Sequence, residues 1–403
     1  MPHYVRMGNV PHKRHTQHRR PDGQLYSEEV IGAEGFSGIS SIAYHVHPPT
    51  VVDRVLDPIP FGVEYTDLDF LRHRHVRGFN VPSEGAWLES RRYVMGNADV
   101  RLAVASPSQE MDYFYRNAVA DEMIYVHDGE GVLESPFGNV PFSKGDYVHV
   151  PRTITHRWRF NEGPRRLLVI ESFSEIHFPK RYMNNSGQLL EHSPFCERDI
   201  RPPTELVTHE EEGAFEVRIA KHDYLHPVIF RYHPFDFVGW DGYMYPYATS
   251  IHDFEPITGR VHQPPPVHQH FTGHNFVICS FVPRLFDYHP QAIPAPYNHS
   301  NIDSDEVLYY AEGDFMSRRG IERGSFTLHP GGIAHGPHPG TVEASIGKAR
   351  TEELAVMVDT FRPLKLTKLA VGAEDKDYML SWRPELYDRP GSPQSGFESE
   401  TGH

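Results

Sequence analysis

The sequence predicts a mainly β protein with two β-barrel domains, and four observations support this fold class. Alternating runs of apolar and polar residues are common, among them MIYVHDG, GDYVHVP, VLYYAEG and ELAVMVDTF. The 32 glycines and 35 prolines separate these runs at short intervals, as turns separate the strands of sandwiches and barrels. Long stretches with a helical period are scarce. Two segments of the chain also resemble each other, which indicates an internal duplication.

The two similar segments share their spacing of glycine, proline and histidine. In the first, DEMIYVHDGEG precedes KGDYVHVPRTITH, and in the second, DEVLYYAEGDF precedes RGSFTLHPGGIAH. In both, six residues separate the glutamate from a glycine, and a histidine lies five positions past the proline. We therefore expect barrels at roughly residues 95–175 and 225–365, within an N-terminal domain of residues 1–200 and a C-terminal domain of residues 201–382. Residues 383–403 are polar and are expected to form a flexible tail.

The composition argues against several classes of protein. The net charge of −15 gives no electrostatic basis for nucleic-acid binding. No window approaches eighteen uninterrupted apolar residues, so neither a transmembrane helix nor a membrane partner is expected. No apolar run follows the basic N-terminus, so the expected compartment is the cytoplasm. Cys196 and Cys279 are the only cysteines and imply no disulfide framework.

The second of the similar segments carries three candidate metal ligands. These are His299, Glu306 and His335, which lie among alternating apolar residues and turn glycines. Two imidazoles and one carboxylate form the ligand set typical of non-haem Fe(II) oxygenases, which leaves coordination positions open for substrate and oxygen. The same ligand types also accept Mn, Co or Ni, so the sequence alone leaves the metal open.

The first segment retains only part of this ligand set. Tyr115 stands at the position that corresponds to His299, and only Glu122 and His156 remain as candidate ligands. Because two ligands hold iron poorly, we expect the first barrel to be degenerate, metal-free and structural.

The spacing of these residues resembles the two motifs of the cupin superfamily, whose members are jelly-roll β-barrels. The motifs correspond here to His299-x-Asn301-x4-Glu306-x6-Gly313 and Gly324-x5-Pro330-x-Gly332-x2-His335. The resemblance implies a bicupin in which the second barrel binds a divalent metal.

Longer stretches resemble the homogentisate 1,2-dioxygenase family, specifically its shorter bacterial branch. They are GRVHQPPPVHQHFTGHNFVICSFVPRLFDYHPQAIPAPYNHSN, DSDEVLYY, LHPGGIAHGP and, near the N-terminus, KRHTQHRRPDGQLYSEEVIGAEGFSGISSIAYHVHPPT. The resemblance implies an Fe(II) enzyme that opens the ring of homogentisate with O2, giving maleylacetoacetate in tyrosine and phenylalanine breakdown. It also implies a homo-oligomer, either a trimer or a dimer of trimers.

The same resemblance assigns roles to individual residues. The three candidate ligands match the iron ligands of the family. His329, six residues before the last ligand, matches a histidine that contacts the substrate. His262 matches the histidine taken as general base, and His268 is its competitor for that role. Tyr297 is placed to hydrogen-bond the substrate carboxylate.

Two departures from the family pattern leave alternatives open. The glutamate follows the first histidine by seven positions rather than six, so Asp305 rivals Glu306 as the carboxylate ligand. Phe315 stands where the family has a substrate-side tyrosine, and Tyr309 or Tyr310 would have to supply that hydroxyl. Otherwise the substrate is a related hydroquinone such as gentisate. A metal cupin that is not an oxygenase, such as an isomerase, is the remaining alternative.

Overall fold

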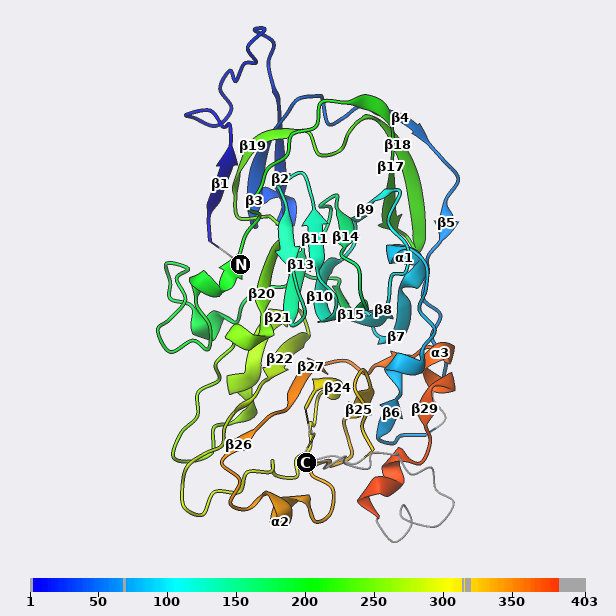
Figure 1. Cartoon of the computed structure of the whole chain (residues 1–403), viewed down its shortest axis with the longest axis vertical. Coiled ribbons are helices and arrows are strands. Elements are labelled where there is room, and N and C mark those ends of the chain that lie inside the picture. The colour runs from blue at the N-terminus through cyan, green and yellow to red at the C-terminus, as the bar shows by residue number, and fades with distance from the viewer. Residues whose placement is uncertain (1–2, 68–69, 314, 316–319, 384–403) are drawn as a thin grey trace. The chain divides into compact units, whose positions relative to one another are not determined.

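The computed structural model describes residues 3–67, 70–313, 315 and 320–383 (Figure 1). Within these residues lie 29 strands and three short α-helices, α1 (Trp87–Ser90), α2 (Thr341–Ser345) and α3 (Lys368–Gly372). The predicted mainly β class is confirmed. No helix in the described part of the chain is long and apolar enough to cross a membrane. The predicted tail falls, from residue 384 on, outside the described residues.

Contacts between residues divide the chain into two compact units. The first comprises Met1–Tyr65, Pro82–Phe254 and Phe271–His274, and the second Thr66–Val81, Glu255–His270 and Asn275–His403. This division does not coincide with the predicted domain boundary at residue 200. Residues 201–254 join the first unit because their strands pair with strands that precede residue 200. A short N-terminal segment, Thr66–Val81, joins the second unit for the same reason.

The first unit contains four sheets. The largest has the order β16-β20-β13-β10-β15-β8-β7, and the others are β1-β19-β3-β2, β12-β11-β14 and β4-β18-β17-β9, where β5 also pairs with β18. The bounds are β1 (Val5–Gly8), β2 (Ser27–Gly32), β3 (Ser40–His45), β4 (Val52–Val55), β5 (Ile59–Pro60), β7 (Arg92–Gly96), β8 (Val100–Ala105), β9 (Phe114–Asn117), β10 (Asp121–Asp128), β11 (Gly131–Glu134), β12 (Val140–Phe142), β13 (Asp146–Val150), β14 (Arg157–Phe160), β15 (Arg166–Ser172), β16 (Ile200–Arg201), β17 (Glu212–Lys221), β18 (Tyr224–Tyr232), β19 (Phe237–Gly242) and β20 (Tyr247–Ser250).

The second unit contains one large sheet with the order β22-β27-β24-β25-β6-β29 and the small pair β23-β26. The bounds are β6 (Arg74–Val76), β22 (Phe276–Phe281), β23 (Arg284–Leu285), β24 (Asp305–Glu312), β25 (Phe326–His329), β26 (Arg350–Thr351), β27 (Leu354–Thr360), β28 (Lys365–Leu366) and β29 (Glu374–Asp375), and β21 (Gln269–Gly273) crosses the boundary between the units. Arg74 of β6 pairs with Glu374 of β29 at 3.0 Å, and both side chains are buried. This ion pair helps to fix the N-terminal strand β6 in the second sheet.

The internal duplication is visible in the strand registers. Three cross-strand pairs of the first unit recur at the corresponding positions of the second. In the first unit the pairs are Glu122–Val150, Glu122–Glu171 and Tyr115–His156. In the second unit the corresponding pairs, in the same order, are Glu306–His329, Glu306–Asp359 and His299–His335. Because side chains alternate between the two faces of a strand, equal registers place corresponding side chains on corresponding faces.

Both central strands carry acidic residues into the interior. In β10, every residue from Asp121 to His127 is buried, and in β24 both Asp305 and Glu306 are buried. A buried carboxylate needs hydrogen bonds or a cation to offset its lost hydration. The groups that contact these carboxylates therefore indicate which cation or hydrogen-bond donors stabilise them in each unit.

Candidate metal centre

Three side chains of the second unit converge on one point. His299 precedes β24, Glu306 is the second residue of β24, and His335 follows β25. The N–H of His299 donates to the carbonyl of His335 at 2.8 Å, and the N–H of His335 donates back at 2.9 Å. This bridge holds the two rings 4.2 Å apart between centroids. One ligand atom from each of the three residues lies within 4.8 Å of the other two.

The donor atoms in this cluster suit a divalent metal. Within the described part of the chain, both ring nitrogens of His335 are buried and make no hydrogen bond. The Nε2 atoms of His335 and His299 lie 3.2 and 3.5 Å from the carboxylate oxygens of Glu306. Burial raises the pKa of Glu306, but hydrogen bonds from His299 and His329 outweigh it and hold that pKa well below its usual range. An ionised carboxylate between two imidazoles is a set that several first-row metals accept.

His329, the last residue of β25, lies behind the carboxylate of Glu306. Its Nδ1 is 2.8 Å from Oε1 of Glu306, and its Nε2 is 3.3 Å from the hydroxyl of Tyr378. The ring is fully buried and stacks on His335 with a centroid distance of 4.5 Å. These contacts orient the Glu306 carboxylate. Direct contact between His329 and a substrate stays a prediction.

Asp305, the rival carboxylate, faces away from the cluster and binds the backbone. Its Oδ1 accepts the N–H of Gly331 at 2.9 Å, and its Oδ2 accepts the N–H of Leu364 at 2.8 Å. Asp121 binds two backbone N–H groups in the same way in the first unit. The geometry therefore favours Glu306 as the carboxylate ligand and gives Asp305 a structural role.

Asp359 is a further carboxylate beside the cluster, and no motif in the sequence selects it. It lies opposite Glu306 across β24 and β27, and its Oδ1 is buried without a hydrogen-bond partner among the described residues. Burial, followed by the charge of Glu306, raises the pKa of Asp359 to about 8. Two neighbouring carboxylates cannot both ionise cheaply unless a cation offsets their charge.

A cavity of about 510 Å³ opens in the second unit, and two predicted site residues line it. Their rings, those of His262 and Tyr297, are 5.0 Å apart, and Tyr297 is 6.0 Å from the ring of His299. Nδ1 of His262 lies 3.3 Å from Oδ2 of Asp287. This contact favours a proton on Nδ1 and leaves Nε2 of His262 as an acceptor.

His268, the competitor for the role of general base, does not line this cavity. Its buried ring packs against Phe281 with a centroid distance of 4.5 Å. Burial, followed by the charge of Arg284, lowers its pKa well below the usual value. Of the two candidate bases, the structure therefore places His262 at the cavity.

The tyrosines proposed to replace the missing substrate hydroxyl are core residues. Tyr309 and Tyr310 are both buried, and neither lines the cavity. The hydroxyl of Tyr310 is 2.9 Å from that of Thr327. Phe315 packs on the Tyr310 ring at 4.5 Å, within the hydrophobic core. Substrate contact by these residues therefore stays a prediction that the packing does not support.

A fourth histidine at the cluster, after His299, His329 and His335, comes from the N-terminal half of the sequence. The ring of His73 lies 5.4 Å from His329, 6.0 Å from His335 and 4.8 Å from Trp382. The RHRHV run around His73 looks like an ordinary short strand, and no motif spacing connects it with the cluster. Only the pairing of β6 with β25 brings it there.

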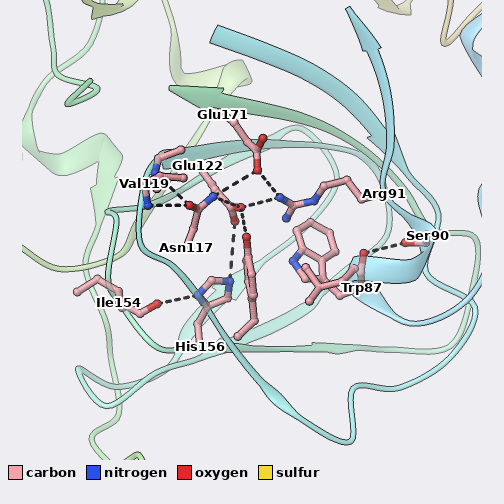
Figure 2. A network of polar contacts seen from close by, with 12 residues as sticks. Trp87, Ser90, Arg91, Asn117, Val119, Glu122, Ile154, His156 and Glu171 are labelled. Atoms are coloured by element: carbon pink, nitrogen blue, oxygen red, sulfur yellow. Dashed lines mark hydrogen bonds and ion pairs between the residues drawn. The ribbon is translucent and has the colours of Figure 1, made fainter. Parts of the chain in front are cut away.

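Figure 2 shows the corresponding position of the first unit, where the guanidinium of Arg91 lies beside Glu122 and Glu171, and His156 keeps the position of His335. Nη1 of Arg91 lies 2.6 Å from Glu122 and 2.8 Å from Glu171. The hydroxyl of Tyr115 and the amide of Asn117 each donate to Glu122 at 3.1 Å. A fixed cation and two neutral donors therefore converge on Oε1 of Glu122, while its Oε2 is buried without a hydrogen-bond partner among the described residues.

His156 completes the network through a long contact with Glu122 (Figure 2). Its Nδ1 lies 3.0 Å from the carbonyl of Ile154, and its Nε2 is 4.0 Å from Glu122. Burial lowers the pKa of His156, so the ring is neutral at pH 7. The predicted absence of a metal from the first unit gains a physical reason, because Arg91 already supplies the charge that a metal would bring.

Comparison with known proteins relates this geometry to a family. A family model described as "Homogentisate 1,2-dioxygenase N-terminal" matches residues 79–251. The "Putative dioxygenase" of Saccharolobus solfataricus is 41% identical over 383 residues, which cover 94% of this chain and 98% of that protein. The homogentisate 1,2-dioxygenase of Bradyrhizobium diazoefficiens is 25% identical over 298 residues, which cover 68% of this chain and 63% of that protein. A solved cupin 2 conserved barrel domain protein from Leptotrichia buccalis aligns with a TM-score of 0.31 at 12% identity, over 74% of this chain and 100% of that one.

Proposed function

Because the chain belongs to the homogentisate 1,2-dioxygenase family, we propose that it is a metal-dependent dioxygenase that opens the ring of a dihydroxylated aromatic acid. The proposed metal is Fe(II), and the proposed reaction adds both atoms of O2 to homogentisate and gives maleylacetoacetate. The observation that carries the proposal is the cluster of His299, Glu306 and His335. A cavity of about 510 Å³ lies near it, because the ring of Tyr297, which lines the cavity, is 6.0 Å from that of His299.

The three residues of the cluster would hold the metal. When bound, Fe(II) would supply the one-electron chemistry that lets O2 react with a spin-paired aromatic ring. Two neutral imidazoles and one carboxylate occupy three coordination positions and leave the others open. His329 holds Glu306 in place at 2.8 Å from behind, so the carboxylate enters the site already oriented.

His262 is suited to accept a proton from a phenolic hydroxyl. It stands at the cavity wall beside Tyr297, and Asp287 lies next to its Nδ1. With a proton fixed on Nδ1, Nε2 can take the phenolic proton, and Asp287 stabilises the imidazolium that results. Loss of that proton makes the ring richer in electrons and easier to oxidise.

The cavity also provides groups for the two ends of an aromatic acid. Arg260 lines it and brings a positive charge for the carboxylate of the substrate, and the Tyr297 hydroxyl can add a hydrogen bond. Ile293 and Val342 offer apolar surface for the ring. This combination supports an acidic aromatic substrate over a neutral one.

Oxygen consumption by the Fe(II)-loaded protein tests the proposal. Homogentisate should be consumed with one O2 per molecule, and absorbance should show the ring-opened product. Gentisate, with a shorter acidic arm, and 3-hydroxyphenylacetate, which lacks the hydroxyl at position 2 of the ring, serve as matched comparisons. Uptake with gentisate alone would move the proposal to that substrate. Failure with every hydroquinone, despite bound iron, would favour a metal cupin without oxygenase activity.

A further inference from the structure

A second cavity, of about 140 Å³, lies entirely within the first unit. Residues from β2, β3, β9, β18 and β19 line it, together with the turn at Thr153–Thr155 that follows β13. It is distinct from the candidate metal centre, because none of its lining residues belongs to the second unit. Neither the proposed reaction nor the buried Arg91 network uses it.

Arg116 supplies this cavity with a cation that forms no ion pair among the described residues, although the charge of Glu29 raises its pKa against the larger effect of burial. On β9, Tyr115 and Asn117 point toward Glu122, so the intervening Arg116 points to the opposite face. Its Nε donates to the hydroxyl of Thr155 at 2.8 Å, and no described residue accepts a hydrogen bond from its two terminal nitrogens. An arginine keeps its charge even where burial lowers its pKa, as it does here.

The acidic groups of the cavity are engaged with His45 instead of Arg116. Nδ1 of His45 lies 2.7 Å from Asp236, and its Nε2 lies 2.9 Å from Glu29. The second oxygen of Asp236 accepts the N–H of His47 at 2.9 Å. Glu29 leaves 41% of its side chain exposed, so water screens its remaining charge. The terminal nitrogens of Arg116, which donate no hydrogen bond to these acidic groups, are therefore available to a ligand in the cavity.

Thr153 adds a strained residue to the same wall. Its φ of 67° lies in the left-handed region, which is costly for a β-branched side chain. The corresponding position of the second unit, two residues past the matching proline, is Gly332, with a φ of 92°. The same turn is therefore made without strain by glycine in one copy and with strain by threonine in the other. Strain of this kind is concentrated at functional sites.

We propose that this cavity binds a small organic carboxylate, which the terminal nitrogens of Arg116 and the hydroxyl of Thr153 hold. The planar fork of a guanidinium matches a carboxylate through two parallel hydrogen bonds. The body of the ligand would lie against the stacked rings of His47 and Tyr232, which are 3.9 Å apart, and against Phe230. A flat, largely apolar acid fits this combination of charge and aromatic surface.

Calorimetric titration of the full chain with benzoate tests the proposal, with benzamide as the neutral isostere and inorganic phosphate as a tetrahedral anion. Benzoate should bind, and benzamide and phosphate should bind at least tenfold more weakly. Arg116→Gln should weaken benzoate binding at least tenfold, and Arg116→Lys should restore part of it. Arg54→Gln, at an exposed position outside the cavity, is the matched control and should change nothing.

Thr153→Gly separates a binding role from a structural one and does not depend on the Arg116 variants folding. Removing the strain should raise Tm, whereas removing the hydroxyl should weaken benzoate binding severalfold. His222→Gly relieves a comparable φ of 55° in a turn outside the cavity and should raise Tm without affecting binding. A crystal soaked with 4-bromobenzoate should show anomalous bromine signal in the cavity. Unchanged benzoate affinity in both Arg116→Gln and Thr153→Gly, or a preference for phosphate, would overturn the proposal.

Discussion

Glu306 lies directly opposite Asp359 where β24 pairs with β27, so two carboxylates face one another inside the second unit. The first unit has the same arrangement in Glu122 and Glu171. There Arg91 lies between the two carboxylates, whereas in the second unit histidines surround Glu306. Both copies of the duplicated fold thus contain an acidic pair, but the groups that contact it differ. In the first unit it is the guanidinium of Arg91, and in the second it is a set of histidines.

The first prediction concerns the fixed cation. Arg91→Gln leaves Glu122 and Glu171 buried without a counter-charge, and loss of one partner from a buried ion pair costs about 3–5 kcal/mol of unfolding free energy. Urea denaturation measures this loss. The triple variant Arg91→Gln, Glu122→Gln, Glu171→Gln removes all three charges and should recover most of it. Equal destabilisation of the single and triple variants would show that packing, not charge, holds the network.

The second prediction concerns the candidate metal site. His335→Ala should abolish iron binding and activity, because it removes one of only three ligands, and the fold should persist. Iron per chain by elemental analysis and Tm measure the two effects. His192→Ala, at an exposed position of the first unit, is the control for the loss of a histidine. Full iron content in His335→Ala would refute the assigned ligand set.

The third prediction distinguishes the two adjacent carboxylates. Glu306→Gln should lose iron with a modest change in stability. Asp305→Asn should keep iron but lose about 1–3 kcal/mol, because its new amide group would face backbone N–H groups that need an acceptor. Iron content and urea denaturation of both variants test the distinction. The opposite pattern would make Asp305 the ligand.

The fourth prediction concerns the proton acceptor. His262→Gln should lower kcat by about 10²–10⁴-fold, the usual contribution of a general base. Iron content should stay unchanged, since His262 is outside the ligand cluster. His268→Gln should change Tm more than kcat because that ring is buried against Phe281. A large loss of kcat in His268→Gln, with kcat unchanged in His262→Gln, would reverse the assignment.

The fifth prediction concerns the pH dependence of stability in the first unit. Burial disfavours the charge on His45, but hydrogen bonds to Asp236 and Glu29 outweigh it and raise its pKa from 6.5 to about 9. The folded state therefore binds the proton more tightly than the unfolded state. This contribution is complete below pH 6.5 and is lost as pH rises through about 9.

At about 1.4 kcal/mol per pKa unit, the contribution of His45 is on the order of 3 kcal/mol. Urea denaturation between pH 6 and 10 should show this decline in the wild-type protein and a flatter profile in His45→Gln. Parallel profiles in the two proteins would show that His45 is not the group responsible.

The sequence by itself determined the mainly β class, the duplication and the three candidate ligands. These depend on local spacing, because alternation along β24 fixes which residues share the face of Glu306, and the glycine and proline offsets fix the turns. The same local reasoning left Asp305 and Glu306 as rivals and could not choose between His262 and His268. Each choice depends on what lies opposite the side chain, and that residue is distant in the sequence.

Only the tertiary structure decided which remote residues complete each site. Strand pairing brings His73 beside His329 and His335 and places Asp359 opposite Glu306. In the first unit, the fold brings Arg91 into an ion pair with Glu122. The register between paired strands depends on which face of each strand is buried in the core, so it cannot be predicted from a single motif. For the same physical reason, the strained turn at Thr153 and the free donors of Arg116 became visible only in the folded chain.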